Sequence, residues 1–523
     1  MEVLLTGSSM DQTIFQSILF ERTEDRIGEE PLEAPSFFVD LNLDQVVDAI
    51  TVGKQEYNLK PFFYAPLHDA DAIEYRHGVM RDLESGTLLE SIESFAQAMH
   101  EMREHLAQAD RLHHKHQRER WFLDAVEIYC DAVNGLAHDL SLVDLKSRGF
   151  LAFREYLSDY ANSERFGSLL AWTKELMADL STVRYCLHTK GNSITVRKYQ
   201  SEVDYGAEIE DTFGRFKHGV VKDYRSKFPD SPDMNHVEAK VLDCVAQLYP
   251  DRFLNLDEYC RKNRNYLDVT IDDFDREIQF YIAYLGYVAR LLRAGLEFCY
   301  PQVSSQSREV YNYEGFDVAL AQKLVSEDSV VVPNDFHLKG KERIIVVSGP
   351  NQGGKTTFAR AFGQLHYLAS LGCPVPGREA QIFPFDRLFT HFEKEEIIHD
   401  LRGALEDDLV RIHHILDQAT SNSIIIMNEI FASTTLQDAI FLNKEVMKRI
   451  HDLDLLCVWV TFVEQLASFS EKTVSMVSTV DPENPALRTF RIVRKPADGL
   501  AYAISIVERY RLTYDHLRER VTA

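Results

Sequence analysis

The sequence lacks the features of a membrane or secreted protein. Its 523 residues contain no run of about 18 apolar residues, so a membrane span is not expected. The first residues, MEVLLTGSSMDQTIF, have no basic segment before the apolar ones, which argues against a secretory signal. The seven cysteines are scattered singly, without a C-x-x-C pair, which argues against a disulfide framework or a zinc ribbon. We therefore expect a cytoplasmic protein with reduced thiols and no membrane partner.

Positive charge is also scarce. The chain has 57 Lys and Arg against 82 Asp and Glu, a formal net charge of −25. A protein that binds duplex DNA over a broad face gains from a positive surface, so any contact with nucleic acid is expected to be local. The length predicts two or three domains.

The first region of the chain has no dominant pattern, and the second is helical. Residues 1–60 are predicted to be an N-terminal extension. Between residues 61 and 320, apolar residues recur at spacings of three and four, which predicts a core and lever domain of long packed helices. Examples of this spacing are Leu88, Ile92, Phe95 and Met99, and Ile278, Tyr281, Leu285, Val288 and Leu292. Near residues 185–200, a Gly-Asn turn and alternating apolar residues predict a small β-hairpin.

Residues 321–523 have the pattern of an α/β domain. Buried-strand sequences at 343–349 (RIIVVSG), 423–429 (SIIIMNE) and 455–462 (LLCVWVTF) alternate with helical segments. Continuous apolar strands of this kind are typical of a parallel sheet that is covered on both faces. The predicted fold class is therefore a C-terminal α/β domain preceded by a mainly α-helical part, and the glycine-rich segment at 349–356 makes it a P-loop ATPase domain.

One glycine-rich segment in this region matches a phosphate-binding loop. Residues 349–356 fit G-x-x-x-x-G-K-[ST], with an apolar strand before them and a helical segment after them. Such a loop turns its backbone N–H groups and a helix N-terminus toward phosphates, and its lysine reaches the β- and γ-phosphates. A chance glycine-rich turn is the alternative. The predicted ATP-binding residues here are Gly349, Pro350, Asn351, Gln352, Gly353, Gly354, Lys355, Thr356 and Thr357.

A second apolar strand ends in Asn428 and Glu429, about seventy residues past the lysine. An acidic pair at this place usually holds Mg²⁺ with its first member and polarises the attacking water with its second. We predict that Thr356 and Asn428 hold Mg²⁺ and that Glu429 is the catalytic base, against the alternative of a solvated carboxylate. Because the amide of Asn428 carries no charge, we expect weak Mg²⁺ binding and slow hydrolysis.

The sequence of the loop, GPNQGGKTT (349–357), closely resembles the GPNxGGKST loop of the MutS family of DNA mismatch-repair ATPases. Segments 333–335, 385–390 and 428–438 are also similar to family motifs, and 64–76 resembles the element that opens the family's core domain. The resemblance implies that Pro333 and Asn334 contact the nucleotide. It also implies a homodimer held partly by C-terminal helices, and a clamp, here the hairpin, that grips DNA.

Several positions depart from the family pattern. Val331 replaces an aromatic residue, Gly403 replaces a serine that acts on the partner subunit, and Phe462 replaces a histidine near the γ-phosphate. The family's mismatch-reading domain has no counterpart before residue 61. These departures imply a divergent, MutS-related ATPase that binds ATP and DNA, with the DNA contacts made to the backbone.

Two other functions fit parts of the sequence. A nucleotide-switched scaffold that binds protein partners and not DNA agrees with the net charge of −25. A small-molecule kinase would need an acceptor pocket and a lid in place of the long helical region, and we consider it the weaker alternative.

Overall fold

The structure is a computed structural model that describes residues 15–22, 30–201, 233–392, 403–431, 433–481, 483–484, 487–497 and 518. By packing, the chain divides into two units, one made of residues 1–14, 84–145 and 151–275 and the other of 15–83, 146–150 and 276–523. The boundaries predicted at residues 60 and 320 differ from this division and stay a prediction. Among the described residues, no helix is long and apolar enough to cross a membrane.

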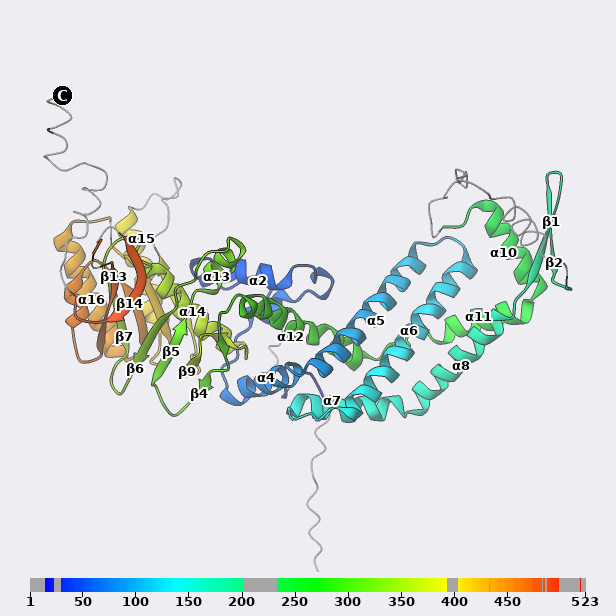
Figure 1. Ribbon diagram of the computed structural model, residues 1–523, viewed down its shortest axis with the longest axis horizontal. Coiled ribbons are helices and arrows are strands. Elements are labelled where there is room, and N and C mark those ends of the chain that lie inside the picture. The colour runs from blue at the N-terminus through cyan, green and yellow to red at the C-terminus, as the bar shows by residue number, and fades with distance from the viewer. Residues whose placement is uncertain are drawn as a thin grey trace, which may run out of the picture. The chain divides into compact units, whose positions relative to one another are not determined.

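The first unit is built from long helices and one hairpin. Helices α5 and α6 pack side by side along the apolar stripes that the sequence predicted, and the hairpin lies against α10 (Figure 1). The predicted hairpin is confirmed by the antiparallel pairing of β1 with β2. The bounds are α5 Gly86–Arg111, α6 Lys115–Leu142, α8 Glu164–Ser181, β1 Tyr185–Lys190, β2 Ser193–Lys198, α10 His236–Leu248 and α11 Pro250–Lys262.

Two helices, α7 (Arg148–Ala161) and α12 (Val269–Arg293), contribute residues to both units. The stripe predicted on α12 is right at Ile278, Tyr281 and Val288, which are buried, but wrong at Leu292, which is 48% exposed. The buried positions at this end of the helix are Tyr284, Tyr287 and Leu291. The hydroxyls of Tyr284 and Tyr287 donate to the backbone carbonyls of Pro374 and Val318, so these tyrosines fill the core with their polar groups paired.

A six-stranded sheet forms the centre of the second unit. Its strand order is β10-β11-β12-β7-β13-β14, and all neighbours are parallel except β13 and β14. The three apolar runs in the sequence become β7, β11 and β12, so the prediction of a largely parallel sheet is confirmed. The bounds are β7 Ile344–Ser348, β10 Leu388–Phe392, β11 Ile424–Asn428, β12 Leu456–Val460, β13 Thr473–Val480 and β14 Arg488–Arg494.

Helices cover both faces of this sheet. Alternate residues of β7, β11 and β12, such as Met427 and Trp459, share a buried cluster with α15 and α16. On the other face lies α14, where a Cβ at Gly363 would come within 2.7 Å of the Ile426 side chain. The bounds are α13 Val318–Ser326, α14 Lys355–Ser370, α15 Ala404–Gln418, α16 Leu436–Leu453 and the 3₁₀ helix η3 Glu464–Ser468.

A four-stranded sheet of order β4-β9-β5-β6, a small pair β3-β8 and several N-terminal helices complete this unit. The strands are β3 Phe298–Cys299, β4 Gln302–Val303, β5 Val310–Gly315, β6 Asn334–Leu338, β8 Val375–Pro376 and β9 Glu379–Ile382. The N-terminal elements are α1 Phe37–Asp40, α2 Leu43–Thr51, η2 Gln55–Tyr57, α3 Lys60–Tyr64 and α4 Ala70–Leu83.

The N-terminal segment packs directly on α14. The rings of Phe37 and Phe38 lie 5.3 and 5.1 Å from that of Tyr367. Two α14 side chains donate to backbone carbonyls of this segment, Arg360 to Asp40 and Gln364 to Leu41, both at 2.9 Å. Because buried aromatic contacts and paired polar groups occur together, Phe38 and Leu41, both fully buried, are part of the core around the sheet.

The buried His366 on α14 predicts a loss of stability in acid. Burial lowers the pKa of this imidazole to about 4. As the pH falls, this histidine is therefore protonated near pH 6.5 in the unfolded chain but only near pH 4 in the folded chain. Stability is therefore full above pH 6.5 and falls between pH 6.5 and 4, by at most about 1.4 kcal/mol per pH unit from this group. The measurement is the free energy of unfolding in urea across this pH range. His366→Phe should flatten the dependence, whereas His413→Gln, at an exposed histidine, should not; equal slopes in both variants and the wild type would contradict the assignment.

Candidate functional site

The loop after the central strand β7 needs glycine at specific positions. Gly349 and Gly354 have φ angles of 117° and 89°, a region that side chains with a Cβ rarely occupy. A Cβ at Gly349 would also lie 2.9 Å from the carbonyl oxygen of Ser478 on β13. The Ser478 hydroxyl donates to the carbonyl of Gly353 at 2.7 Å. The loop is thus packed tightly on β13, and α14 begins directly after it.

Lys355, the first residue of α14, is enclosed by the loop. Its Nζ donates to the carbonyl oxygens of Gly349 and Pro350 at 3.1 and 3.2 Å and to Asn351 Oδ1 at 3.3 Å. It lies 3.6 Å from Glu429 Oε1. Only 4% of the residue is exposed, and this burial lowers the pKa of the amine while the carboxylate of Glu429 acts in the opposite direction.

The second predicted motif meets the loop at the end of β11. Thr356 Oγ1 donates to Asn428 Oδ1 at 3.0 Å, so the two residues predicted to hold Mg²⁺ lie together. Glu429 follows with a φ of 53°, and its backbone N–H donates to the Val460 carbonyl of β12 at 2.9 Å. This hydrogen bond and the turn at Glu429 fix the backbone from which its carboxylate reaches Lys355.

The ring of Phe462 also contacts the Lys355 ammonium group. Its ring centroid is 4.7 Å from Lys355 Nζ, a cation–π distance, and the residue is 54% exposed. An aromatic hydrocarbon ring has no hydrogen-bond donor, so at this position it stabilises the lysine without being able to donate to a phosphate.

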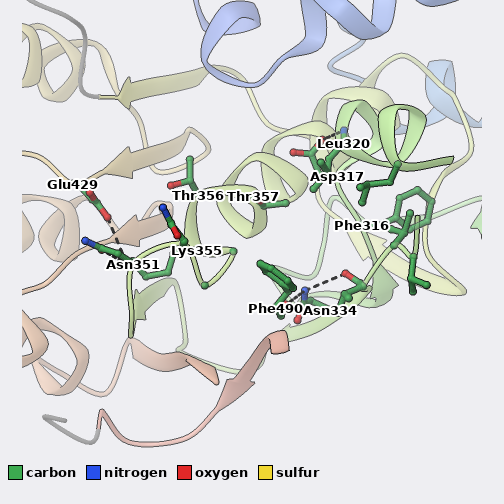
Figure 2. Close-up of a pocket in the computed structure, with 17 residues that line it drawn as sticks. Phe316, Asp317, Leu320, Asn334, Asn351, Lys355, Thr356, Thr357, Glu429 and Phe490 are labelled. Carbon is green, nitrogen blue, oxygen red and sulfur yellow. Dashed lines mark hydrogen bonds and ion pairs between the residues drawn. The ribbon is translucent and has the colours of Figure 1, made fainter. Parts of the chain in front are cut away.

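A pocket of about 680 Å³ opens beside the loop. Of the predicted residues, Asn334, 351–357 and Glu429 line it, whereas Gly349, Pro350, Pro333 and Asn428 do not. Figure 2 shows the polar residues Glu429, Asn351 and Lys355 together at one end of the pocket and Phe316 and Leu320 at the other. The pocket therefore has a charged end and an apolar end.

Sequence reasoning missed the apolar end. Phe316, three valines and two leucines of α13 form it, together with Phe490 of β14. Asp317 caps α13 by accepting from the Leu320 N–H at 3.1 Å, and Gln364 of α14 donates to the same carboxylate at 2.9 Å. Burial raises the pKa of Asp317. Among these residues the sequence had singled out Val331, as the replacement of an aromatic residue, and the aspartate before an apolar helical segment was a second signal; no motif marks the others. The leucines and valines are Leu320, Leu324, Val330, Val331 and Val332.

The segment with Pro333 and Asn334 is attached to β14. Asn334 Oδ1 accepts from the Ile492 N–H at 2.7 Å, and its Nδ2 donates to the Phe490 carbonyl at 3.2 Å. The Pro333 carbonyl accepts from Arg491 at 3.1 Å. Phe490 has a φ of 58° and is 49% exposed. Asn334 thus holds the backbone of Phe490, whose side chain lines the pocket.

Comparisons with known proteins agree with this arrangement. Residues 345–512 match MutS domain V. The DNA mismatch repair protein MutS of Orientia tsutsugamushi (strain Boryong) is 26% identical over 216 residues, which are 40% of this chain and 24% of that protein. The chain is thus similar to MutS proteins, most clearly over the residues that match MutS domain V.

Two further MutS relatives cover other amounts of the chain. The protein of Zymomonas mobilis is 31% identical over 164 residues, 30% of this chain and 19% of the relative. That of Halalkalibacterium halodurans is 22% identical over 289 residues, 53% of this chain and 32% of the relative. The matches thus span a third or less of the length of these MutS proteins. The described structure is mixed α/β, with MutS domain V following a mainly helical part, and the predicted dimerisation helices at the C-terminus lie outside the described residues.

Proposed function

We propose that the chain is a MutS-related protein that binds ATP and Mg²⁺, hydrolyses ATP slowly, and couples its nucleotide state to DNA binding as a homodimer. In this proposal residues 321–523 are the P-loop ATPase domain, 61–320 the core and lever domain, and 1–60 an N-terminal extension. The observation that carries the proposal is the meeting of the 349–356 loop with the end of β11, where Thr356 contacts Asn428 and Lys355 contacts Glu429.

The shape of the pocket fits a nucleoside triphosphate. Its volume of about 680 Å³ lies in the range of pockets for ligands of this size. The positive φ angles of Gly349 and Gly354 and the close packing of Gly349 and Gly353 on Ser478 require glycine in the loop, which leaves its backbone uncovered by side chains at these positions. The apolar end offers Phe316, Leu320 and Phe490 to a base. The charged end of the pocket therefore suits the phosphates, and the apolar end suits the base of the nucleotide.

The residues also fit a magnesium ion. Thr356 Oγ1 and Asn428 Oδ1 are oxygen donors 3.0 Å apart, and Mg²⁺ in such sites is held by few protein oxygens together with phosphates and water. Bound there, Mg²⁺ would neutralise charge on the phosphates. Asn428 gives this site a neutral oxygen where the family pattern has a carboxylate, so the ion is held less firmly.

Glu429 is the proposed general base. It lines the pocket at the charged end, and its side chain is 25% exposed, so it can meet a water molecule there. Its Oε1 would accept the proton of the attacking water, while Lys355 balances the charge of the carboxylate. Phe462 cannot donate a hydrogen bond to a phosphate, which is a second reason to expect slow turnover.

Replacing Lys355 tests nucleotide binding. Lys355→Ala removes a charge-assisted hydrogen bond worth about 1.5–3 kcal/mol, so the affinity for MgATP should fall about 10- to 150-fold. Isothermal titration calorimetry would measure it, with circular dichroism as the check on folding. Lys341→Ala is the matched control because Lys341 pairs with Glu471 on the exposed surface. Equal ATP binding by all three proteins would refute the phosphate-binding role.

Replacing Asn428 tests the magnesium site. Asn428→Asp keeps an oxygen that accepts from Thr356 and adds a negative charge, so Mg²⁺ should bind more tightly and hydrolysis should be faster. The expected result is a lower Mg²⁺ concentration for half-maximal ATPase activity and a higher kcat. Asn443→Asp, at a buried amide in the same domain, is the control for effects of charge alone. Unchanged Mg²⁺ dependence in Asn428→Asp would contradict the assignment.

The β1–β2 hairpin supports local contact with DNA. Residues 184–199 contain four Lys or Arg and no Asp or Glu, in a chain with a net charge of −25. The strand register places His188 and Arg197 on one face and Leu187 and Val196 on the other. A basic, exposed hairpin is suited to phosphate contacts, and the family relationship makes DNA the proposed polyanion. DNA binding at the hairpin is the reason for preferring this function over the protein-binding scaffold.

Charge reversal on the hairpin tests this interaction. Lys190→Glu with Arg197→Glu should weaken duplex DNA binding and lower the slope of log affinity against log salt by about 2, because each of the two side chains would neutralise one phosphate in the wild type. Fluorescence anisotropy over a salt series, with and without a non-hydrolysable ATP analogue, would measure it. Lys240→Glu, at a lysine whose side chain is 80% exposed on α10, should change less. Absence of DNA binding by the wild type at low salt would favour the scaffold instead.

A homodimer is proposed because family sites of this kind are completed across a subunit interface. Large apolar side chains that follow β11 and β12 are exposed in the single chain, namely Leu436, Phe441 and Phe462 at 72%, 63% and 54%. Exposed apolar groups beside a binding site are typical of interaction surfaces, which supports an interface at this end of the sheet.

A further inference from the structure

The two ends of the pocket differ in polarity, and this difference identifies the end where a terminal phosphate would lie. This step rests on the proposed function. With a base at Phe316 and Leu320, the phosphate chain runs along the loop toward Asn351, Lys355 and Glu429 (Figure 2). The last phosphate would therefore lie nearest to Asn351, whose Oδ1 accepts a hydrogen bond from Lys355 Nζ. A residue that discriminates ATP from ADP must act at this end.

Positive charge in the lining of the pocket is sparse for such a ligand. Among the described residues that line it, Lys355 is the one Lys or Arg, and Asp317 and Glu429 are acidic. The position after β12 that usually carries a histidine in the family has Phe462. A triphosphate held by one lysine and a neutral magnesium ligand would leave charge on its last phosphate without a protein partner.

Arg488 lies against the loop at this end. It is the first residue of β14, and its Nε donates to the backbone carbonyl of Asn351 at 3.1 Å. Its charge acts on Lys355, whose pKa it lowers in addition to the effect of burial. A guanidinium presents several N–H groups in a planar fork, which suits phosphate oxygens better than a point charge does.

We propose that Arg488 binds the terminal phosphate of ATP and gives the site its preference for the triphosphate over the diphosphate. Arg488 does not line the pocket itself, but it contacts Asn351, which does, and it comes from β14, the strand that also holds Phe490 at the pocket wall. It supplies a donor at the end of the phosphate chain, where Phe462 has none. Its bond to Asn351 fixes the guanidinium to the loop that carries the phosphates.

Two other arginines of β14 serve for comparison. Arg491 donates to the Pro333 carbonyl at 3.1 Å. Arg494 forms an ion pair with Glu342 and donates to the His337 carbonyl. Both bind protein groups away from Asn351, so a general effect of positive charge on this strand can be separated from an effect of Arg488.

The test compares the affinities for MgATP and MgADP by isothermal titration calorimetry. In Arg488→Gln the MgATP affinity should fall about 10- to 100-fold, the loss of a hydrogen bond to a charged group, while the MgADP affinity stays within about 2-fold because the inner phosphates keep their hydrogen bonds to the loop. Arg488→Lys, which keeps the charge but not the planar guanidinium, should have an MgATP affinity between those of the wild type and Arg488→Gln. Arg494→Gln should match the wild type for both nucleotides.

The outcomes separate this proposal from the function on which it rests. Equal loss of MgATP and MgADP affinity in Arg488→Gln would mean that Arg488 only shapes the loop, and unchanged affinities would mean that it does not touch the nucleotide; either overturns the proposal and leaves ATP binding intact. A wild-type protein that binds neither nucleotide would overturn the proposed function, and this proposal with it.

Discussion

The burial of one ammonium group organises the site. Lys355 starts α14 with its Nζ surrounded by two loop carbonyls, the Asn351 side chain, the Glu429 carboxylate and the ring of Phe462. A charge this far from water is tolerated only when it is paired and hydrogen-bonded. The loop, β11 and the segment after β12 must therefore all be in place around it. This single requirement links three strand ends that are far apart in the sequence.

The parallel sheet makes that meeting possible. The loop follows β7, Glu429 follows β11 and Phe462 follows β12, and these strands are neighbours in one sheet. Carboxyl ends of parallel strands lie at the same edge, which is where such sheets bind ligands. On the opposite side of the loop, β13 supplies Ser478 and β14 supplies Phe490 and Arg488. The pocket is thus bordered by segments on both sides of the central strand.

The sequence predicted the parts of this site that are encoded locally. The apolar runs at 343–349, 423–429 and 455–462 became neighbouring parallel strands because uninterrupted apolar residues require burial on both faces. The loop and its lysine were found from the spacing of a few residues. The apolar wall was not found, because Leu320, Val330 and Phe490 come from segments with no shared pattern, and only the order of the strands brings them together. Leu292 was misplaced because the buried face of α12 continues there through Tyr284, Tyr287 and Leu291.

The course of the chain between its two units has a consequence for biosynthesis. Residues 15–83 pack with residues 276–523, and most of the helical unit lies between them in the sequence. A ribosome would therefore release the aromatic residues Phe37 and Phe38 long before it makes Tyr367, their partner on α14. Domains generally fold as units during synthesis. The helical unit can therefore fold before residues 37–41 have their packing partners on α14. The N-terminal segment can pack on α14 only after Tyr367 has been made.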